Sequence, residues 1–150
     1  MSYSNNRDFQ IPKEDIKEWI TNGISRPCIN YTEALGEYLC DLKGYRNNDA
    51  LSTSQIRNYF GEVKRIQLLD NDENRRSSFL LIKPKIAYAT ARVIQRNRNS
   101  RITTFKSVID VAHESVETEI NKKLNEKHFQ NFVDFLESIL AFHKAYGGRD

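Results

Sequence analysis

The chain has 150 residues, of which 39% are hydrophobic and 29% charged, and its formal net charge is +3. This length is enough for one domain that buries about two thirds of its unfolded surface, so no metal or disulfide is needed to hold it together. The longest apolar runs, 79–82 and 139–142, are too short to cross a bilayer, and the first ten residues lack the apolar stretch of a secretion signal. We therefore expect a soluble, cytoplasmic protein without membrane contact.

The first part of the chain predicts two helices. Residues 1–10 are expected to form a flexible tail, and Pro12 then precedes an apolar pattern that ends at Asn22-Gly23, which is typical of a short helix. Residues 24–29 contain Arg26-Pro27 and are expected to form a loop. Apolar residues at helical spacing then predict a second helix from about residue 34 to Gly44. Cys28 and Cys40 lack the further cysteines of a disulfide framework or zinc site, so they are expected to be buried, reduced thiols.

The middle of the chain predicts two more helices. Ser52 and Gln55 have the spacing of a capping box, which predicts a helix that starts there. Residues 70–74 are expected to form a turn, and the next helical region runs to about Asn97. Pro84 either begins a helix in this region or kinks a continuous one. The sequence leaves both alternatives open.

The last part of the chain predicts two amphipathic helices. Apolar residues from Phe105 to Ile120 repeat every three to four positions, which predicts a helix over about 102–123. A helix over about 126–146 has a broad apolar face, so we expect it to be central, and Gly147-Gly148 ends it. Six helical segments without strand patterns predict an all-α fold, a compact bundle of about five to six helices in a single domain over 11–150.

Positive charge is concentrated in one part of the chain. Between Asn74 and Lys106 there is no Asp or Glu, but there are nine basic residues, at positions 75, 76, 83, 85, 92, 96, 98, 101 and 106. Because a solvated helical surface normally mixes both signs, this segregation favours a polyanionic partner, with nucleic acid ahead of a membrane. An ordinary basic surface patch is the alternative interpretation.

Three of these basic residues form a stripe on the predicted helix. At about 100° per residue, Lys85, Arg92 and Arg96 fall within about 20° of one line that is roughly 16 Å long, enough to follow about two or three phosphates. The other side of the helix is expected to carry the apolar residues Ile86, Ala87, Ala91, Val93 and Ile94.

The preceding helix has a similar flank, formed by Arg57, Gly61 and Lys64. A glycine inside a helix costs about 1 kcal/mol relative to alanine, so its presence favours a close approach by a partner or by a neighbouring helix.

A catalytic site is the less favoured interpretation. Asp110, Glu114 and Glu117 share a polar face beside His113, but the pattern lacks the second histidine of a metalloprotease helix, and the chain has no Walker loop, G-x-S-x-G or dinucleotide fingerprint. A solvated acidic face, or one that docks on a basic subunit, is favoured. His143 is expected to pack beside the apolar band of the last helix with one nitrogen satisfied.

Three blocks of the sequence resemble a known family: LSTSQIRNYFGEVKRI at 51–66, LLIKPKIAYATAR at 80–92 and FVDFLESILAFHKAYGG at 132–148. In this order they resemble the small helical subunit of type III-A CRISPR effector complexes, the Csm family. The resemblance implies a non-catalytic α-helical protein without a cofactor. It also implies several copies in a complex that carries a guide RNA.

The implied partners are the guide RNA–target RNA duplex or the target RNA strand, the repeated backbone subunit, the large polymerase/nuclease subunit and neighbouring copies of the protein. Because base pairing reads the sequence in such complexes, the protein is expected to contact phosphates and 2′-hydroxyls. Matching the family's blocks assigns RNA contacts to Arg57, Lys64, Lys83, Lys85 and Arg92. The charge pattern alone adds Arg65, Arg96 and Arg101.

A structural helical adaptor is the competing interpretation. Its basic face would dock on an acidic protein partner, without direct RNA contact. Salt dependence separates the two, because a phosphate binder releases counterions and, on a single strand, loses about 0.7 log unit of affinity per phosphate for each tenfold rise in salt.

Overall fold

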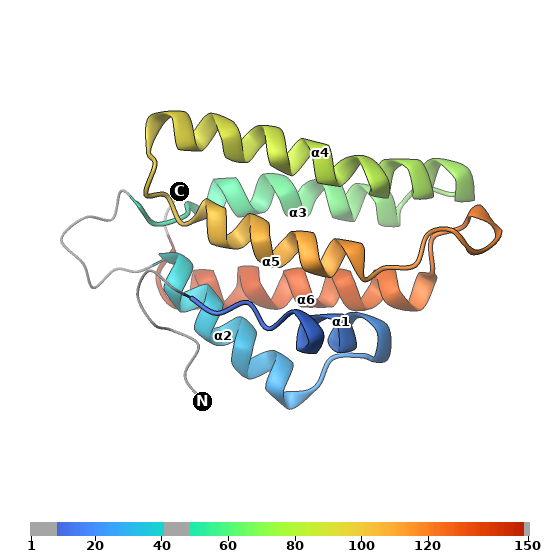
Figure 1. Cartoon of the computed structure of the whole chain (residues 1–150), viewed down its shortest axis with the longest axis horizontal. Helices are drawn as coiled ribbons and strands as arrows, with labels where there is room; N and C mark the ends of the chain where they lie inside the picture. The colour runs from blue at the N-terminus through green and yellow to red at the C-terminus, as the bar shows by residue number, and fades with distance from the viewer. Residues whose placement is uncertain (1–8, 41–48, 149–150) are drawn as a thin grey trace.

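The computed structural model describes residues 9–40 and 49–148, and Figure 1 shows their arrangement. In these ranges the chain forms six α-helices, with a short 3₁₀ turn before the last of them and no strand, which confirms the predicted all-α fold. The elements are α1 (Lys13–Asn22), α2 (Arg26–Cys40), α3 (Thr53–Gln67), α4 (Asp72–Arg96), α5 (Ile102–Glu114), the 3₁₀ turn η2 (Ile120–Lys122) and α6 (Glu126–Ala145).

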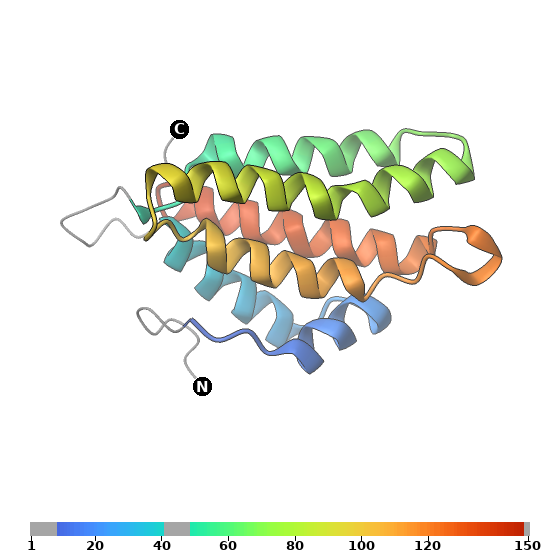
Figure 2. The same cartoon turned by 45° about the horizontal axis from the view of Figure 1, so that its top comes forward.

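Helix α6 is the centre of the bundle, as its broad apolar face predicted. It packs against α1, α2, α3 and α5, whereas α4 packs mainly against α3 and α5. Helices α3 to α6 run along the long axis of the molecule, and α1 and α2 lie on one side of them (Figures 1 and 2). Within α6, Phe132, Phe135, Leu136 and Ile139 are completely buried. Helix α4 is therefore a peripheral helix, which leaves much of its surface available.

The start of α2 differs from the sequence prediction. Residues 26–29, expected in a loop, form the first turn of α2, with Pro27 as its second residue. A proline is tolerated there because its missing amide hydrogen would have no acceptor inside the helix. The loop prediction was therefore wrong for these residues. The predicted end of this helix, near Gly44, lies outside the described residues.

Helix α5 is shorter than predicted, because it ends at Glu114 and not near residue 123. The Glu117 carboxylate accepts hydrogen bonds from the backbone amides of Glu119 and Ile120, and local bonds of this kind compete with helix formation. Asn121 and Lys122 have φ values of 57° and 54°, in the left-handed region. The apolar periodicity placed Ile120 on the buried face of this helix, but the residue is 67% exposed.

The N-terminal segment joins the core earlier than expected. Phe9 is buried and stacks on Tyr38 with ring centroids 4.8 Å apart, and the Tyr31 hydroxyl donates to the Gln10 carbonyl at 3.0 Å. Phe9 and Gln10 belong to the segment expected to be a tail. The rest of that segment, residues 1–8, lies outside the described residues.

Helix α3 begins as the sequence predicted. The Ser52 hydroxyl accepts a hydrogen bond from the Gln55 amide at 3.1 Å, and the Gln55 side-chain oxygen accepts one from the Ser52 amide at 2.8 Å. These reciprocal bonds confirm the capping box, which satisfies two backbone donors at the start of the helix.

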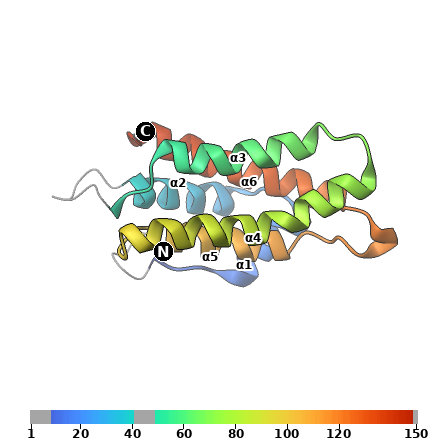
Figure 3. The same cartoon turned by 90° about the horizontal axis from the view of Figure 1, so that it is seen from above.

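Helix α4 continues through Pro84 and changes direction part-way along its length (Figure 3). Pro84 cannot donate to the Leu80 carbonyl, and a proline inside a helix is a common cause of such a bend. Of the two alternatives that the sequence left open, the structure therefore has the continuous helix.

A side chain of α5 binds a backbone carbonyl on the core side of α4. His113 Nε2 lies 2.7 Å from the Phe79 carbonyl oxygen. Because a carbonyl oxygen only accepts, Nε2 carries the proton.

Candidate nucleic-acid interface

The basic residues of α4 that precede Pro84 pair with acids from distant parts of the chain. The acids lie on α5, on α6 and between them, and the pairs are Arg75–Glu126, Arg76–Glu119 (2.7 Å) and Lys83–Glu114 (2.7 Å). Although residues 75–83 contain no acidic residue, the folded surface around them does, because acids from other parts of the chain lie there. In this half of α4 the cations join the helix to its neighbours.

Lys83, one of the predicted RNA contacts, belongs to this paired half. Its hydrogen bond to Glu114 raises the pKa of the Lys83 ammonium and lowers the pKa of the Glu114 carboxyl. Both side chains are about half exposed, and exposed pairs contribute only about 0–1 kcal/mol. Lys83 can therefore leave Glu114 for another anion at little cost in stability.

After Pro84 the pattern changes. Lys85, Arg92 and Arg96, which we call the α4 stripe, are exposed along one flank of the helix. The Arg92 guanidinium carbon lies 5.8 Å from the centroid of the Tyr88 ring, an exposed cation–π contact. In the described part of the chain, no acidic side chain pairs with Arg92 or Arg96. These two cations are therefore available to a polyanion.

The buried side of α4 matches the predicted one only in part, because Ile86 is buried and Val93 and Ile94 pack against the core as expected, but two alanines do not. Phe79, Ile82, Ile86 and Thr90 are buried in a single row, while the expected core residues Ala87 and Ala91 are exposed. Only one row is buried because α4 packs mainly against two helices, α3 and α5. On the helical wheel the α4 stripe is about 100° from this row, on the flank toward α3.

Glu62 of α3 meets the first cation of the stripe. Its carboxylate lies 3.3 Å from Lys85 Nζ and 3.2 Å from Arg65 Nη2. Hydrogen bonds from Arg65 and then from Lys85 lower the pKa of the Glu62 carboxyl. The structure thus brings together Arg65 and Lys85, two predicted RNA contacts, and the three groups together carry a net positive charge.

Arg57 and Lys64, the other predicted contacts on α3, lie elsewhere. Both are exposed, and they are more than about 130° around the helix from Glu62, so they lie on the flank away from α4. Lys64 Nζ lies 5.6 Å from the centroid of the Phe60 ring. No described atom lies within 4 Å of the place where a Cβ on Gly61 would be, so none of the described helices accounts for this glycine. The two predicted stripes therefore do not form one continuous surface.

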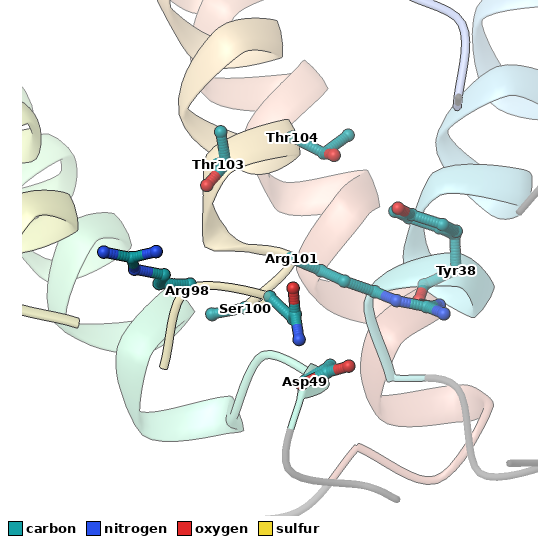
Figure 4. A pocket seen from close by; sticks show the side chains of 8 residues that line it. Tyr38, Asp49, Arg98, Ser100, Arg101, Thr103 and Thr104 are labelled. Carbon is teal, nitrogen blue, oxygen red and sulfur yellow. The ribbon is translucent and has the colours of Figure 1, made fainter. Parts of the chain in front are cut away.

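Arg101 has a partner inside the fold. Its Nη1 donates to the Tyr38 carbonyl at 2.6 Å, and its guanidinium carbon lies 4.1 Å from the centroid of the Tyr38 ring. Figure 4 shows Arg101 extending toward Tyr38 across a polar pocket of about 740 Å³, whereas Arg98 extends in the opposite direction. Arg101 thus connects the turn before α5 to α2, and its RNA contact stays a prediction.

The histidines and acids that were weighed as a catalytic group are engaged separately. His113 is buried and stacks on Phe79 with centroids 4.2 Å apart, and burial lowers the pKa of its imidazole. Asp110 pairs with Lys106 at 2.6 Å, while Glu114 pairs with Lys83. Among the described residues, no three His, Cys, Asp or Glu side chains are placed to hold a metal ion.

Two smaller predictions about buried polar groups are confirmed. His143 is buried with Nε2 2.6 Å from the Leu51 carbonyl oxygen, and among the described residues its Nδ1 has no partner, so one nitrogen is satisfied. Cys28 and Cys40 are buried, reduced thiols, and burial raises the pKa of Cys28 to about 12.

The family follows from the sequence comparison. A family model described as Csm2 Type III-A matches residues 29–149. The chain belongs to the Csm2 family. This confirms the resemblance carried by the three sequence blocks and makes the protein a small subunit of the type III-A CRISPR complex. Comparison with curated proteins and with solved structures gave no match. In the described part of this Csm2 chain, every helix is too short or too polar to cross a membrane.

Proposed function

We propose that this Csm2 protein binds RNA through sequence-independent contacts between phosphates and the α4 stripe, and that it has no catalytic role. The observation that carries the proposal is the exposed flank of α4 after Pro84, where Arg92 and Arg96 have no acidic partner among the described residues. Phosphate contacts position a nucleic acid without reading its sequence, which suits a complex in which base pairing does the reading.

The proposed partners follow from the family. They are the guide RNA–target RNA duplex or the target RNA strand, the backbone subunit, the large polymerase/nuclease subunit and neighbouring copies of Csm2, all in the cytoplasm. Arg65 and Lys83 extend the contact only after leaving their acids. Arg57 and Lys64 would need a second RNA segment on the far flank of α3. A single copy therefore offers few free cations, and tight binding is expected only in the assembled complex.

An adaptor function is the second candidate, because α4 also exposes apolar side chains. Leu81 is 53% exposed and Tyr88 67% exposed, on the side of α4 that faces away from the core. Exposed apolar side chains on one helix face are typical of a protein–protein contact. A Csm2 subunit that docks through this face, without RNA on the stripe, would retain its place in the complex but show no salt-dependent RNA affinity.

A salt titration of the isolated protein tests the proposal. Binding to two single-stranded RNAs of unrelated sequence is measured by fluorescence anisotropy between about 50 and 200 mM salt. We expect similar dissociation constants for both RNAs, on the order of 10⁻⁴ to 10⁻⁶ M, and a linear fall of log affinity with log salt. Nanomolar or sequence-selective binding, or no binding at low salt, would contradict the proposal.

A further inference from the structure

A small pocket opens between α3, α4 and α5 directly beside the α4 stripe. Its volume is about 220 Å³, and its walls are mainly apolar, with Ile86, Ala89 and Val93 from α4, Tyr59 from α3 and Phe105 from α5. The Tyr59 and Phe105 rings meet edge to face, with centroids 5.8 Å apart. Sites for drug-sized ligands typically measure about 300–1,000 Å³, so this pocket suits a single flat ring.

The pocket also has polar groups suited to a nucleobase. Gln55 and Asn58 of α3 line it, together with Lys85 of the α4 stripe. The Gln55 side-chain oxygen accepts from the Ser52 amide, so its NH₂ group remains as a donor, and the exposed Asn58 amide offers both a donor and an acceptor. Amide side chains of this kind can bond to the edge of any base. An apolar protein side chain would leave them unused.

We propose that this pocket takes one unstacked nucleobase of an RNA strand whose phosphates lie on the α4 stripe. The inference rests on the proposed function, because Lys85 is both a wall of the pocket and the first cation of the stripe. Apolar and aromatic contacts with bases are tolerant of sequence, since every base has a flat apolar face. The pocket would therefore increase the affinity for RNA and fix the position of the strand along the α4 stripe, without preferring one base over another.

Ala89 allows the pocket to be filled without a change in charge. Its methyl group lines the pocket, and on the wheel it lies between Lys85 and Val93. Ala89→Leu should occupy the space of the base. Ala87→Leu is the matched control, because Ala87 is exposed on the same helix and does not line the pocket.

The experiment compares two RNA probes with wild-type protein, Ala89→Leu and Ala87→Leu. One probe is a single-stranded RNA, and the other is the same strand with abasic sites, which keep the phosphates. We expect the abasic strand to bind wild type and Ala87→Leu about tenfold more weakly than the intact strand. Ala89→Leu should bind both strands equally and keep the wild-type salt slope.

The outcomes separate this inference from the proposed function. If both strands bind wild type equally and Ala89→Leu has no effect, the pocket proposal fails while phosphate binding stands. If neither strand binds, both fail. If Ala89→Leu leaves RNA binding unchanged but prevents assembly with the other subunits, the pocket receives a protein side chain, and the nucleobase proposal is overturned.

Discussion

The two halves of α4 use the same kinds of residue for different purposes. Before Pro84, Arg75, Arg76 and Lys83 pair with acids from α5, α6 and the segment between them, and Phe79 is buried in the core. After Pro84, the stripe cations Arg92 and Arg96 have no such acids among the described residues, and Tyr88 is exposed. One half holds the helix in place, and the other presents it to a partner.

This difference shows that a segregation of charge along the sequence overstates the segregation on the surface. In the first half of α4, the fold places acidic residues from more than 30 positions along the chain beside the cations. The pair with the smallest separation in sequence is Lys83 and Glu114. Only the second half keeps the unbalanced charge that a polyanion would recognise. The comparison can be tested in both halves.

The largest expected effect is on stability, from truncating a core residue of the first half. Phe79 has no exposed surface and meets Phe129 and Phe132 edge to face, so Phe79→Ala should lower the free energy of unfolding by about 3–5 kcal/mol. Tyr88→Ala, in the second half, should change it by less than about 0.5 kcal/mol. Urea denaturation measures both. Similar losses for the two variants would remove the distinction between the halves.

Low pH should also lower the stability of the protein through His113, which packs on the first half of α4. Burial holds the pKa of His113 below its ordinary value of 6.5, so the unfolded chain binds more protons than the folded protein at mildly acid pH. Stability should therefore be full above pH 6.5 and decrease as the pH falls below it. Melting temperatures across this range measure the effect, to which the buried His143 contributes in the same direction.

The control for the acid effect is His113→Gln, which can still donate to the Phe79 carbonyl but does not titrate. This variant should be less stable at neutral pH because it loses the ring stacked on Phe79, but its stability should depend less on pH. An unchanged pH dependence would show that His113 is not the group responsible.

A smaller change in stability is expected at Gly61, on the flank of α3 away from the stripe. Nothing described lies near a Cβ added there, so Gly61→Ala should raise the free energy of unfolding by about 1 kcal/mol. If RNA or a subunit approaches this flank closely, the variant should also assemble less well. Normal assembly would limit the partner surface to the α4 side.

The smallest expected effect concerns Glu62, which competes with RNA for Lys85. Glu62→Gln removes this competition and should strengthen RNA binding about two- to fivefold, the range for one exposed ion pair. Glu73→Gln makes the same change of charge at an exposed position in the first half of α4 and should have less effect. Anisotropy titrations at low salt compare the two. Equal gains would mean that net charge alone controls the affinity.

Local patterns predicted well where the local interaction decides the structure. The capping box at Ser52 formed as predicted, and the broad apolar face of the last helix placed it at the centre. The end of α5 was missed because Glu117 satisfies backbone amides of the following turn, which periodicity does not reveal. Likewise, the wheel located the α4 stripe but placed Ala87 in the core, because the number of neighbouring helices decides how wide the buried face is.

The site was predicted only in part for the same reason. Which cations are free depends on acids that tertiary structure brings near, such as Glu62 beside Lys85 or Glu119 beside Arg76. The pocket beside the stripe was not predicted, because it needs three helices to form it. Its sequence signal is the pair of amide side chains Gln55 and Asn58, three residues apart on α3.

The central claim is that the second half of α4 binds RNA phosphates, and the double variant Lys85→Glu with Arg92→Glu tests it most directly. Its matched control, Lys127→Glu with Lys144→Glu, makes the same change in net charge at exposed positions of α6. Both variants should keep the wild-type circular dichroism spectrum and melting temperature, because surface changes usually stay within about 0.5 kcal/mol.

The deciding measurement is the salt dependence of RNA affinity for these two double variants. We expect the Lys85/Arg92 variant to bind more weakly to unrelated sequences, with a log–log salt slope shallower by about 1.4, or about 0.7 for each lost phosphate contact. The Lys127/Lys144 variant should keep the wild-type slope. Equal slopes for wild type and the folded Lys85/Arg92 variant would contradict the account and favour a protein partner on this face of α4.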